Sequence, residues 1–422
     1  MPITQDPVEQ RQSCISIAPD DTVYVLWPDE TNWEDMTVNL MKSTDRGHTW
    51  AEPAVIFDGS PFVETGICAD AHGVHVIFVE FTEGEEGEYQ IPWYARSEDG
   101  GVTFSDPVRI GTCDNVNGAR IFSADGIVFL HAQHWGDMTP DNYLFVSLDG
   151  GDTWDEKLIA PGETVQHPGL AVRDGVIHAA FGGTLNSPGI SHSFSTDLGD
   201  TWSQAVAVSD DAGEHSQLPQ IAVDDHAIHV AWEDDRDEHY NVMYSRSTDG
   251  GTTWSSDVQL NDTFYGARVK LLADETGLHA AWCQYHGDDD WPNSWSSADY
   301  GIIWYRFSDD AGVTWTDEFR VSQNEDIPPI DLPDMGANYV KLAEYSAGFC
   351  AMWQDKRDGN IDLYLRNHLI ECPGDFDGDG DVDTADLLFL LAAWGTPDGD
   401  VDGDGDTDTA DLLALLAAWG PC

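Results

Sequence analysis

The stretch STDGGTTW, residues 247–254, places one Asp, two Gly and a Trp within eight positions. Similar stretches begin at residues 43, 97, 147, 195 and 308. In each, the Asp carboxylate can accept hydrogen bonds from backbone N–H groups of a turn, and the Gly can adopt a positive φ without a steric penalty. The closing Trp or Phe is large enough to fix the turn against an apolar layer. Each copy is therefore predicted to lock one outer β-hairpin.

The spacing of these six copies indicates the architecture. Successive copies are 48 to 61 residues apart, which suits a four-stranded propeller blade better than the shorter period of most helical solenoids. Short alternating apolar runs, punctuated by Gly, Asp and Pro, continue until a helical pattern begins at residue 386. The chain is therefore predicted to be an all-β propeller followed by a small helical module.

The pattern S-x-D-x-G-x-x-W resembles the Asp box of sialidases and other BNR-repeat propellers, and the resemblance covers residues 1–370. It implies a sialidase-like propeller fold. Asp boxes lie on the periphery of that fold and occur in hydrolases, lyases and non-catalytic binding proteins alike, so the resemblance leaves the activity open.

The number of blades is predicted from a second repeated feature. Apolar strand segments recur seven times, one more than the Asp boxes, which predicts seven blades; six, the number in sialidases, is the alternative. The segment PITQDP (2–7) resembles the outer-strand segments VQLNDT (258–263) and FRVSQN (319–324), and is predicted to complete the seventh blade and close the ring. The seven apolar segments are VYVLW (23–27), VHVIF (74–78), IVFLH (127–131), VIHAA (176–180), IHVAW (228–232), LHAAW (278–282) and FCAMW (349–353).

Composition limits the partners and the location. There are 78 acidic and 18 basic side chains, giving a formal net charge of −60. Such a field repels nucleic acids and anionic membranes, so neither is an expected partner. The sequence contains no apolar run of 18 residues that could span a membrane, and no signal peptide is visible. We expect the sequence to be a mature or trimmed form of a secreted, extracellular or cell-surface protein.

The candidate glycan site lies where the innermost strands begin and where loops join the second and third strands, because propellers bind ligands at that axial face. The loops contribute Glu233 among others. Aromatic, acidic, His and Arg side chains together suit a sugar ring with its apolar faces and hydroxyl groups. At the strand starts they are Arg11, Glu64, Arg120, His167, His215, Gln217, Tyr265, Arg268 and Tyr339.

The sialidase resemblance implies a catalytic assignment for five of these residues. Arg11, Arg120 and Arg268 would clamp a substrate carboxylate, with Tyr265 as nucleophile and Glu64 as its partner. The F/Y-R-I-P motif of sialidases is missing, because RQSCISIAP (11–19) stands in its place, and the blade order departs from the family.

Three further alternatives therefore stay open. They are another glycoside hydrolase, a polysaccharide lyase using His167 or His215 with a Tyr as base and acid, and a non-catalytic glycan- or protein-binding propeller.

The C-terminal segment, residues 371–422, contains a duplicated unit. GDFDGDGDVDTADLLFLLAAWG (374–395) is repeated as GDVDGDGDTDTADLLALLAAWG (399–420). Each loop has Asp at positions 1, 3, 5, 7, 9 and 12 and Gly at position 6, which is the pattern of a calcium loop. The unit resembles a type I dockerin, and this implies a cohesin-type partner, although no clear cohesin-recognition signature is present. A calcium-stabilised tag without a cohesin is the alternative.

The calcium ligands are predicted from the loop positions. Positions 1, 3, 5 and 12 supply carboxylates, position 7 supplies a backbone carbonyl, and Asp383 and Asp408 at position 9 act through water. The predicted ligands are Asp375, Asp377, Asp379, Asp381 and Asp386 in the first loop, and Asp400, Asp402, Asp404, Asp406 and Asp411 in the second.

The seven cysteines fall into two groups. Cys372 and Cys422 bracket the duplicated unit and are predicted to form a disulfide in an oxidising exterior. The other five lie in or beside propeller strands, where buried thiols are the expected state, and the sequence leaves any pairing among them open. They are Cys14, Cys68, Cys113, Cys283 and Cys350.

Overall fold

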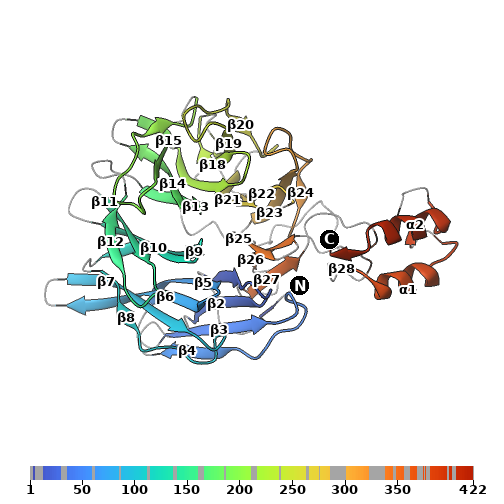
Figure 1. Cartoon of the computed structure of the whole chain (residues 1–422), viewed down its shortest axis with the longest axis horizontal. Coiled ribbons are helices and arrows are strands. Elements are labelled where there is room, and N and C mark those ends of the chain that lie inside the picture. Colours follow the sequence, from blue (N-terminus) through green and yellow to red (C-terminus); the bar gives the residue numbers. More distant parts are fainter. Residues whose placement is uncertain are drawn as a thin grey trace.

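The computed structural model of the chain is drawn in Figure 1. It describes residues 3–4, 13–29, 36–58, 62–84, 87–111, 115–135, 140–159, 166–184, 187–210, 216–236, 239–262, 266–274, 276–285, 301–322, 338–345, 348–355, 362–367, 374, 376, 381–396, 399–401 and 405–421.

Seven antiparallel sheets are arranged as the blades of a propeller, which confirms the seven-bladed prediction over the six-bladed alternative (Figure 1). Blade 1 contains β1 (Cys14–Ile17), β2 (Val23–Asp29), β3 (Thr37–Ser43) and β4 (Ala54–Asp58); blade 2 contains β5 (Phe62–Asp70), β6 (Gly73–Gly84), β7 (Gly87–Ser97) and β8 (Val108–Arg109). Blade 3 contains β9 (Val116–Ala124), β10 (Ile127–Trp135), β11 (Pro140–Ser147) and β12 (Asp155–Leu158); blade 4 contains β13 (Gln166–Arg173), β14 (Val176–Thr184), β15 (Ser187–Ser195) and β16 (Val206–Ala207). Blade 5 contains β17 (Gln217–Val223), β18 (Ile228–Asp234), β19 (Asn241–Ser247) and β20 (Val258–Gln259); blade 6 contains β21 (Gly266–Ala273), β22 (Leu278–Tyr285), β23 (Gly301–Ser308) and β24 (Phe319–Arg320). Blade 7 contains β25 (Asn338–Tyr345), β26 (Gly348–Asp355) and β27 (Asp362–Asn367).

Blade 7 has three strands in the described part of the chain, and the N-terminal segment lies against the third. The Ile3 N–H donates to the Leu363 carbonyl at 2.8 Å, and the Leu363 N–H donates to Thr4 Oγ1 at 2.9 Å. The Ile3 side chain packs in one apolar cluster with Val25 of blade 1 and Leu365 of blade 7. The two ends of the propeller sequence therefore meet at β27, as expected from PITQDP, of which residues 3 and 4 are described (Figure 1).

Each Asp box forms the turn that its sequence predicts. In the box at 247–254, Ser247 Oγ donates to Asp249 Oδ1 at 2.8 Å and accepts the N–H of Gly251 at 2.9 Å. Asp249 Oδ2 accepts the Thr253 hydroxyl at 2.6 Å, and Oδ1 accepts its N–H at 2.9 Å. The hydroxyl and N–H of Thr253, followed by Ser247, lower the pKa of Asp249 to about 2, so the turn holds its carboxylate ionised.

Behind the boxes, a hydrogen-bonded chain links neighbouring blades. Asp70 Oδ1 accepts a hydrogen bond from His75 Nε2 at 3.0 Å, and His75 Nδ1 accepts one from the Tyr94 hydroxyl at 2.8 Å. The Tyr94 ring packs edge-on against Trp154 of the next Asp box, with ring centroids 5.0 Å apart. The same Asp–His–Tyr arrangement recurs in blades 5 and 6 as Asp224–His229–Tyr244 and Asp274–His279–Tyr305. Because it is repeated and buried, we assign it to blade docking and not to catalysis.

This docking predicts unequal costs for two glycine substitutions. A Cβ at Gly151, where φ is +96°, would lie 1.8 Å from the Tyr94 hydroxyl oxygen, whereas a Cβ at Gly250, φ +72°, meets no atom within 4 Å. We expect Gly151→Ala to lower the free energy of unfolding by about 3 kcal/mol or more, because Tyr94 must be displaced as well as the backbone strained. Gly250→Ala should cost only about 1 kcal/mol for its backbone conformation. Urea denaturation of both variants tests this, and equal midpoints would contradict it.

Blade 4 replaces the Tyr of this chain with a second histidine. His178 Nδ1 and His192 Nε2 are 3.1 Å apart, and both side chains are buried. Burial lowers the pKa of His178 to about 4; burial, followed by repulsion from His178, lowers that of His192 to about 3. Both rings are therefore neutral in the folded protein at neutral pH.

Acidification is expected to destabilise the propeller through this pair. Since an unfolded histidine binds its proton near pH 6.5 and the folded pair only near pH 4 or below, stability is complete above pH 6.5 and is lost as the pH falls toward 4. We expect a loss of about 2–4 kcal/mol between pH 7 and pH 5. His192→Tyr, which introduces the Tyr found at this position in blades 2, 5 and 6, should remove about half of this loss or more. Melting curves against pH measure the effect, with exposed His226→Gln as control; an unchanged slope in His192→Tyr would refute it.

The C-terminal segment forms a small separate core. Its elements are β28 (Asp381–Val382), α1 (Thr384–Ala392), α2 (Thr409–Ala417) and β29 (Gly420–Pro421), and β28 pairs antiparallel with β29. Three apolar side chains, Val382, Leu390 and Leu415, are fully buried. This core is too small to account for a stable fold by apolar burial alone.

Candidate functional site

The innermost strands place one residue from each blade at the same depth around the axis. In six blades, one residue of the second strand pairs with the first Ser of the Asp box. Three residues further along the second strand, another residue pairs with one residue of the innermost strand. The aligned strands of blade 7 give the equivalent residue there. We call these seven innermost-strand residues the axial ring. They are Cys14, Gly66, Arg120, Gly169, Gln220, Lys270 and Lys341.

The two described arginines of the predicted clamp lie at different depths. Arg120 pairs with His131 and belongs to the axial ring. Arg268 precedes Lys270 by two residues, at a bulge where its φ is +56°. The similar local sequences NGAR and YGAR therefore lie in different registers. A left-handed conformation at a non-glycine residue costs free energy, so the surrounding structure must hold Arg268 in place.

Glu64 fixes the bulge that precedes Arg120. Its Oε1 accepts the N–H of Gly118 at 2.9 Å and its Oε2 accepts that of Ala119 at 2.8 Å. Burial raises the pKa of Glu64, while the two N–H donors and the charge of Arg120 act in the opposite direction. The carboxylate therefore holds the adjacent blade's strand in position and lies beside a cation.

Glu233 plays the same part next to Arg268. Its Oε1 accepts the Arg268 N–H, and its Oε2 accepts from Gln217 Nε2 at 3.3 Å. Burial raises the pKa of Glu233, and the Arg268 N–H and charge oppose that shift. Two glutamates from different blades, the half-buried Glu64 and the buried Glu233, thus each secure one bulge next to an arginine.

Sequence reasoning missed the two lysines of the axial ring. Lys270 and Lys341 are the equivalent residues of blades 6 and 7. Burial lowers the pKa of Lys270 well below its usual range, and repulsion from Lys341 and Arg120 lowers it further. The repeated tripeptide VKL, at 269–271 and 340–342, was the available signal, but it became meaningful only once the strands were in register.

Several predicted residues lie outside the described part of the chain. These are Arg11, His215 and Tyr265, together with the side chain of His167, whose backbone belongs to β13. The described structure therefore brings Glu64 and Arg120 together and places Arg268 beside Glu233.

Asp386 and Asp411, at position 12 of the two predicted calcium loops, are buried and accept equivalent hydrogen bonds. Asp386 accepts the N–H groups of Phe376 at 2.6 Å and Asp383 at 2.8 Å. Asp411 accepts those of Val401 and Asp408, both at 2.6 Å. Asp383 and Asp408 also cap the N-termini of α1 and α2, each accepting an N–H from the first turn. The duplicated sequence therefore folds into duplicated loop-helix junctions.

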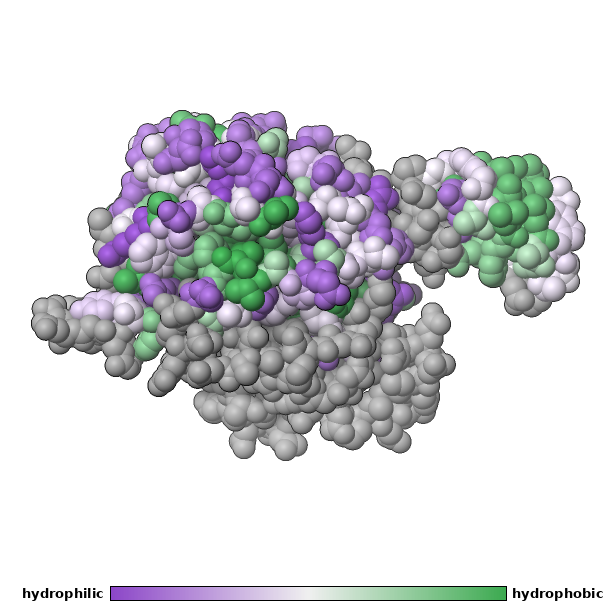
Figure 2. Space-filling model, turned by 90° about the horizontal axis from the view of Figure 1, so that it is seen from below, coloured by the Kyte–Doolittle hydropathy of each residue, from purple (hydrophilic) through white to green (hydrophobic). Residues whose placement is uncertain are grey.

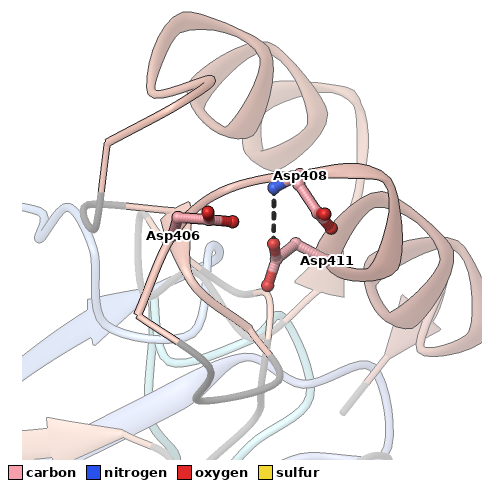
Figure 3. A group of neighbouring side chains, drawn as sticks. All are labelled: Asp406, Asp408 and Asp411. Atoms are coloured by element: carbon pink, nitrogen blue, oxygen red, sulfur yellow. Dashed lines mark hydrogen bonds between the residues drawn. The ribbon is translucent and has the colours of Figure 1, made fainter.

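The second loop gathers three carboxylates (Figure 3). One oxygen atom from each of Asp406, Asp408 and Asp411 lies within 4.8 Å of the others, and Asp400 Oδ2 accepts the N–H of Gly405 at 2.8 Å. A set of oxygen donors around so much like charge fits a hard divalent cation.

The remaining predicted ligands cannot be compared in the same way. Asp375, Asp377, Asp379, Asp402 and Asp404, together with the side chain of Asp381, lie outside the described residues, as do Cys372 and Cys422 of the predicted disulfide.

The C-terminal module exposes apolar side chains that repeat with the sequence duplication (Figure 2). The first unit exposes Leu388, Leu391 and Trp394, and the second exposes the corresponding Leu413, Leu416 and Trp419. Leu388 and Leu413 are 67% and 63% exposed. An apolar surface of this size on so small a module marks a candidate interaction site.

The propeller cysteines agree with the expectation of thiols where they are described. Cys68, Cys283 and Cys350 are buried and free, and Cys14 is free and partly exposed; Cys113 lies outside the described residues. Among the described residues, no helix has the length and apolar character needed to cross a bilayer.

Comparisons with known proteins support the fold. No family model matches the chain, and no curated protein matches it. Among solved structures, a protein of unknown function from Dyadobacter fermentans aligns with a TM-score of 0.50 at 12% identity, covering 86% of this chain and 96% of that one. The chain is thus similar in fold to that protein.

Two sialidases are also similar but align less well. The Hadza microbial sialidase Hz136 has a TM-score of 0.47 at 16% identity, covering 65% of this chain and 63% of that one. Trypanosoma rangeli sialidase has a TM-score of 0.48 at 11% identity, covering 92% of this chain and 56% of that one. The chain therefore spans less than two thirds of either sialidase.

Proposed function

We propose that the chain is an extracellular propeller that binds or cleaves acidic glycans at its axial face, and that the C-terminal module attaches it to a partner in a calcium-dependent manner. The observation that carries the glycan part is Arg268 near the strand starts, whose N–H is bound by the buried Glu233 in a chain with a net charge of −60. Cations kept in an otherwise acidic protein suit a ligand that carries carboxylate or sulfate groups.

Glycan binding is tested with the full chain against sialosides, pectins, ulvan and sulfated algal glycans, with neutral dextran as reference. We expect binding to an acidic glycan and a loss of about tenfold or more in affinity in Arg268→Gln, which corresponds to one charge-assisted contact. Arg173→Gln is the matched control, because Arg173 ends an innermost strand at the opposite end and pairs with Asp225. Equal affinity of both variants, or no binding to any acidic glycan, would contradict the proposal.

Catalysis is tested separately from binding. A hydrolase would release reducing sugar, and a lyase would release an unsaturated product with ultraviolet absorbance. If Tyr265 is the nucleophile, Tyr265→Phe should abolish hydrolysis and retain binding. Product formation that persists in Tyr265→Phe would remove the sialidase-type mechanism, and binding without any product would favour the non-catalytic alternative.

Docking of the C-terminal module is supported by the exposed apolar surface next to the two acidic loops. A cohesin-type domain is the expected partner, and calcium is expected to be required, because the metal would hold α1 and α2 in the relative position that forms this surface. We expect Leu388→Asn combined with Leu413→Asn to reduce capture by such a domain by about a hundredfold. Val313→Asn, an exposed apolar residue of the propeller, is the control. Calcium-independent capture, or capture unaffected by the double substitution, would contradict this part.

A further inference from the structure

The axial ring contains three cations without a carboxylate partner. Arg120, Lys270 and Lys341 come from blades 3, 6 and 7 and lie at the same depth. Among the described residues, no Asp or Glu oxygen lies within 4.0 Å of their nitrogen atoms. The hydrogen bond found for them in that part of the chain joins Lys270 Nζ to Gln220 Oε1 at 3.1 Å.

The absence of carboxylate partners at these three cations contrasts with the other cations of the chain, which has 78 acidic residues. Six described Lys and Arg side chains form ion pairs with carboxylates, and none of the six belongs to the axial ring. They are Arg46 with Asp21, Arg96 with Glu98, Lys157 with Asp200, Arg173 with Asp225, Arg236 with Asp234, and Arg306 with Asp262. Carboxylates are therefore abundant around the cations elsewhere but absent at the described positions of the axial ring.

The nearest glutamates attract the ring cations, but neither forms an ion pair with them. Glu64 directs both carboxylate oxygens to backbone N–H groups of blade 3, and Glu233 binds the Arg268 N–H and Gln217. Burial lowers the pKa values of Lys270 and Lys341, and repulsion from Arg120 lowers both further. An anion between them would replace this repulsion by attraction.

A cavity lies next to the ring. Gly66 and Gly169, in the blades on either side of Arg120, contribute no side chain to the ring, because a Cβ there would lie 2.8 Å from Ile77 Cγ2 and 2.6 Å from the Pro219 carbonyl oxygen. A cavity of about 670 Å³ is lined by the residues two positions beyond the ring, including Ser16, Cys68, Phe122 and Ala343. The cavity extends to the strand ends remote from Arg268, which lies two residues, or about 7 Å, toward the strand starts.

From this arrangement we propose that the axial ring binds one free inorganic oxyanion of the size of sulfate or phosphate. Arg120 supplies planar N–H donors, and Lys270 and Lys341 supply ammonium groups from the other side of the axis. The bound anion connects blade 3 with blades 6 and 7. This site goes beyond the proposed glycan function, which concerns the strand starts and the loops at that face.

The test is equilibrium binding of radiolabelled sulfate to the full-length protein at low ionic strength, together with thermal unfolding. We expect saturable binding of one sulfate per chain and a melting temperature that rises with the same concentration dependence. Lys341→Met should abolish saturable binding. Because it removes a cation without a partner, it should also melt at or above the wild-type temperature in sulfate-free buffer.

Lys157→Met is the matched control, since it makes the same charge change at a surface ion pair and should bind sulfate as the wild type does. Lys270→Met is a second ring variant for the case that Lys341→Met does not fold. It should also lose sulfate binding. The non-specific stabilising effect of sulfate on proteins is not saturable and should persist in every variant. No saturable binding in the wild type, or unchanged binding in a folded ring variant, would overturn the proposal.

A final arm distinguishes a free anion from an acidic group of a glycan. Sulfate binding should persist when an acidic oligosaccharide is present in excess. Displacement of sulfate by the oligosaccharide would assign the ring to the glycan site and overturn an independent anion site. Absence of glycan binding would leave the sulfate result unaffected, so the two proposals fail separately.

Discussion

Removal of calcium from the full-length chain is expected to unfold residues 374–421 and leave the propeller intact. Among the described residues of the module, three apolar side chains are completely buried, and its two helices of nine residues are too short to persist alone in water. Without a cation, Asp406, Asp408 and Asp411 repel one another within 4.8 Å. Calcium binding would therefore supply free energy of folding.

The expected result is measured by hydrogen exchange and calorimetric titration of the full chain. Amides of α1 and α2 should lose protection by about a hundredfold or more in chelator, while those of β22 remain protected. Titration of the wild type should give two calcium ions per chain. Either Asp386→Asn or Asp411→Asn alone should remove one of them, and the two substitutions together should remove both. Asp309→Asn, an exposed propeller carboxylate, is the control. Protection of α1 and α2 that is unchanged by chelator would show that the loops are acidic linkers.

Deletion of residues 1–8 is expected to destabilise the whole propeller. The deletion removes the Ile3 side chain from the cluster between blades 7 and 1 and both hydrogen bonds to Leu363, and it exposes the edge of β27. We expect a loss of about 3–5 kcal/mol, the range for removing a buried apolar side chain and its hydrogen bonds.

Two point variants make this prediction specific. Ile3→Ala should reproduce most of the loss, whereas Ile3→Val should cost about 1 kcal/mol. Thr4→Val should cost about 1–3 kcal/mol, because the Leu363 N–H loses its acceptor. Calorimetric melting of the full chain and the variants provides the comparison. A deletion variant with the wild-type melting temperature would show that the N-terminal segment does not close the ring.

The sequence alone determined the elements whose information is local. Asp249, Ser247 and Gly251 lie within five residues of one another, so the turn that they form could be derived from donor and acceptor chemistry. The same holds for the count of seven blades, which follows from seven apolar strand segments. Ring closure by the N-terminal segment could be predicted because the seventh repeat has no outer-strand segment of its own, whereas the N-terminus of the chain carries one.

Only the tertiary structure decided which side chains share a depth around the axis. Blades 3 and 6 have the same bulge, but YGAR lies two residues earlier relative to it than NGAR does. Arg120 and Arg268 therefore lie at different levels, while Arg120 shares its level with Lys270 and Lys341. Glu64 meets Gly118 across 54 residues of sequence, and Glu233 meets Arg268 across 35. No local pattern specifies such pairs, because they depend on the stacking of whole blades, and that stacking brings the cations of three blades together on one axis.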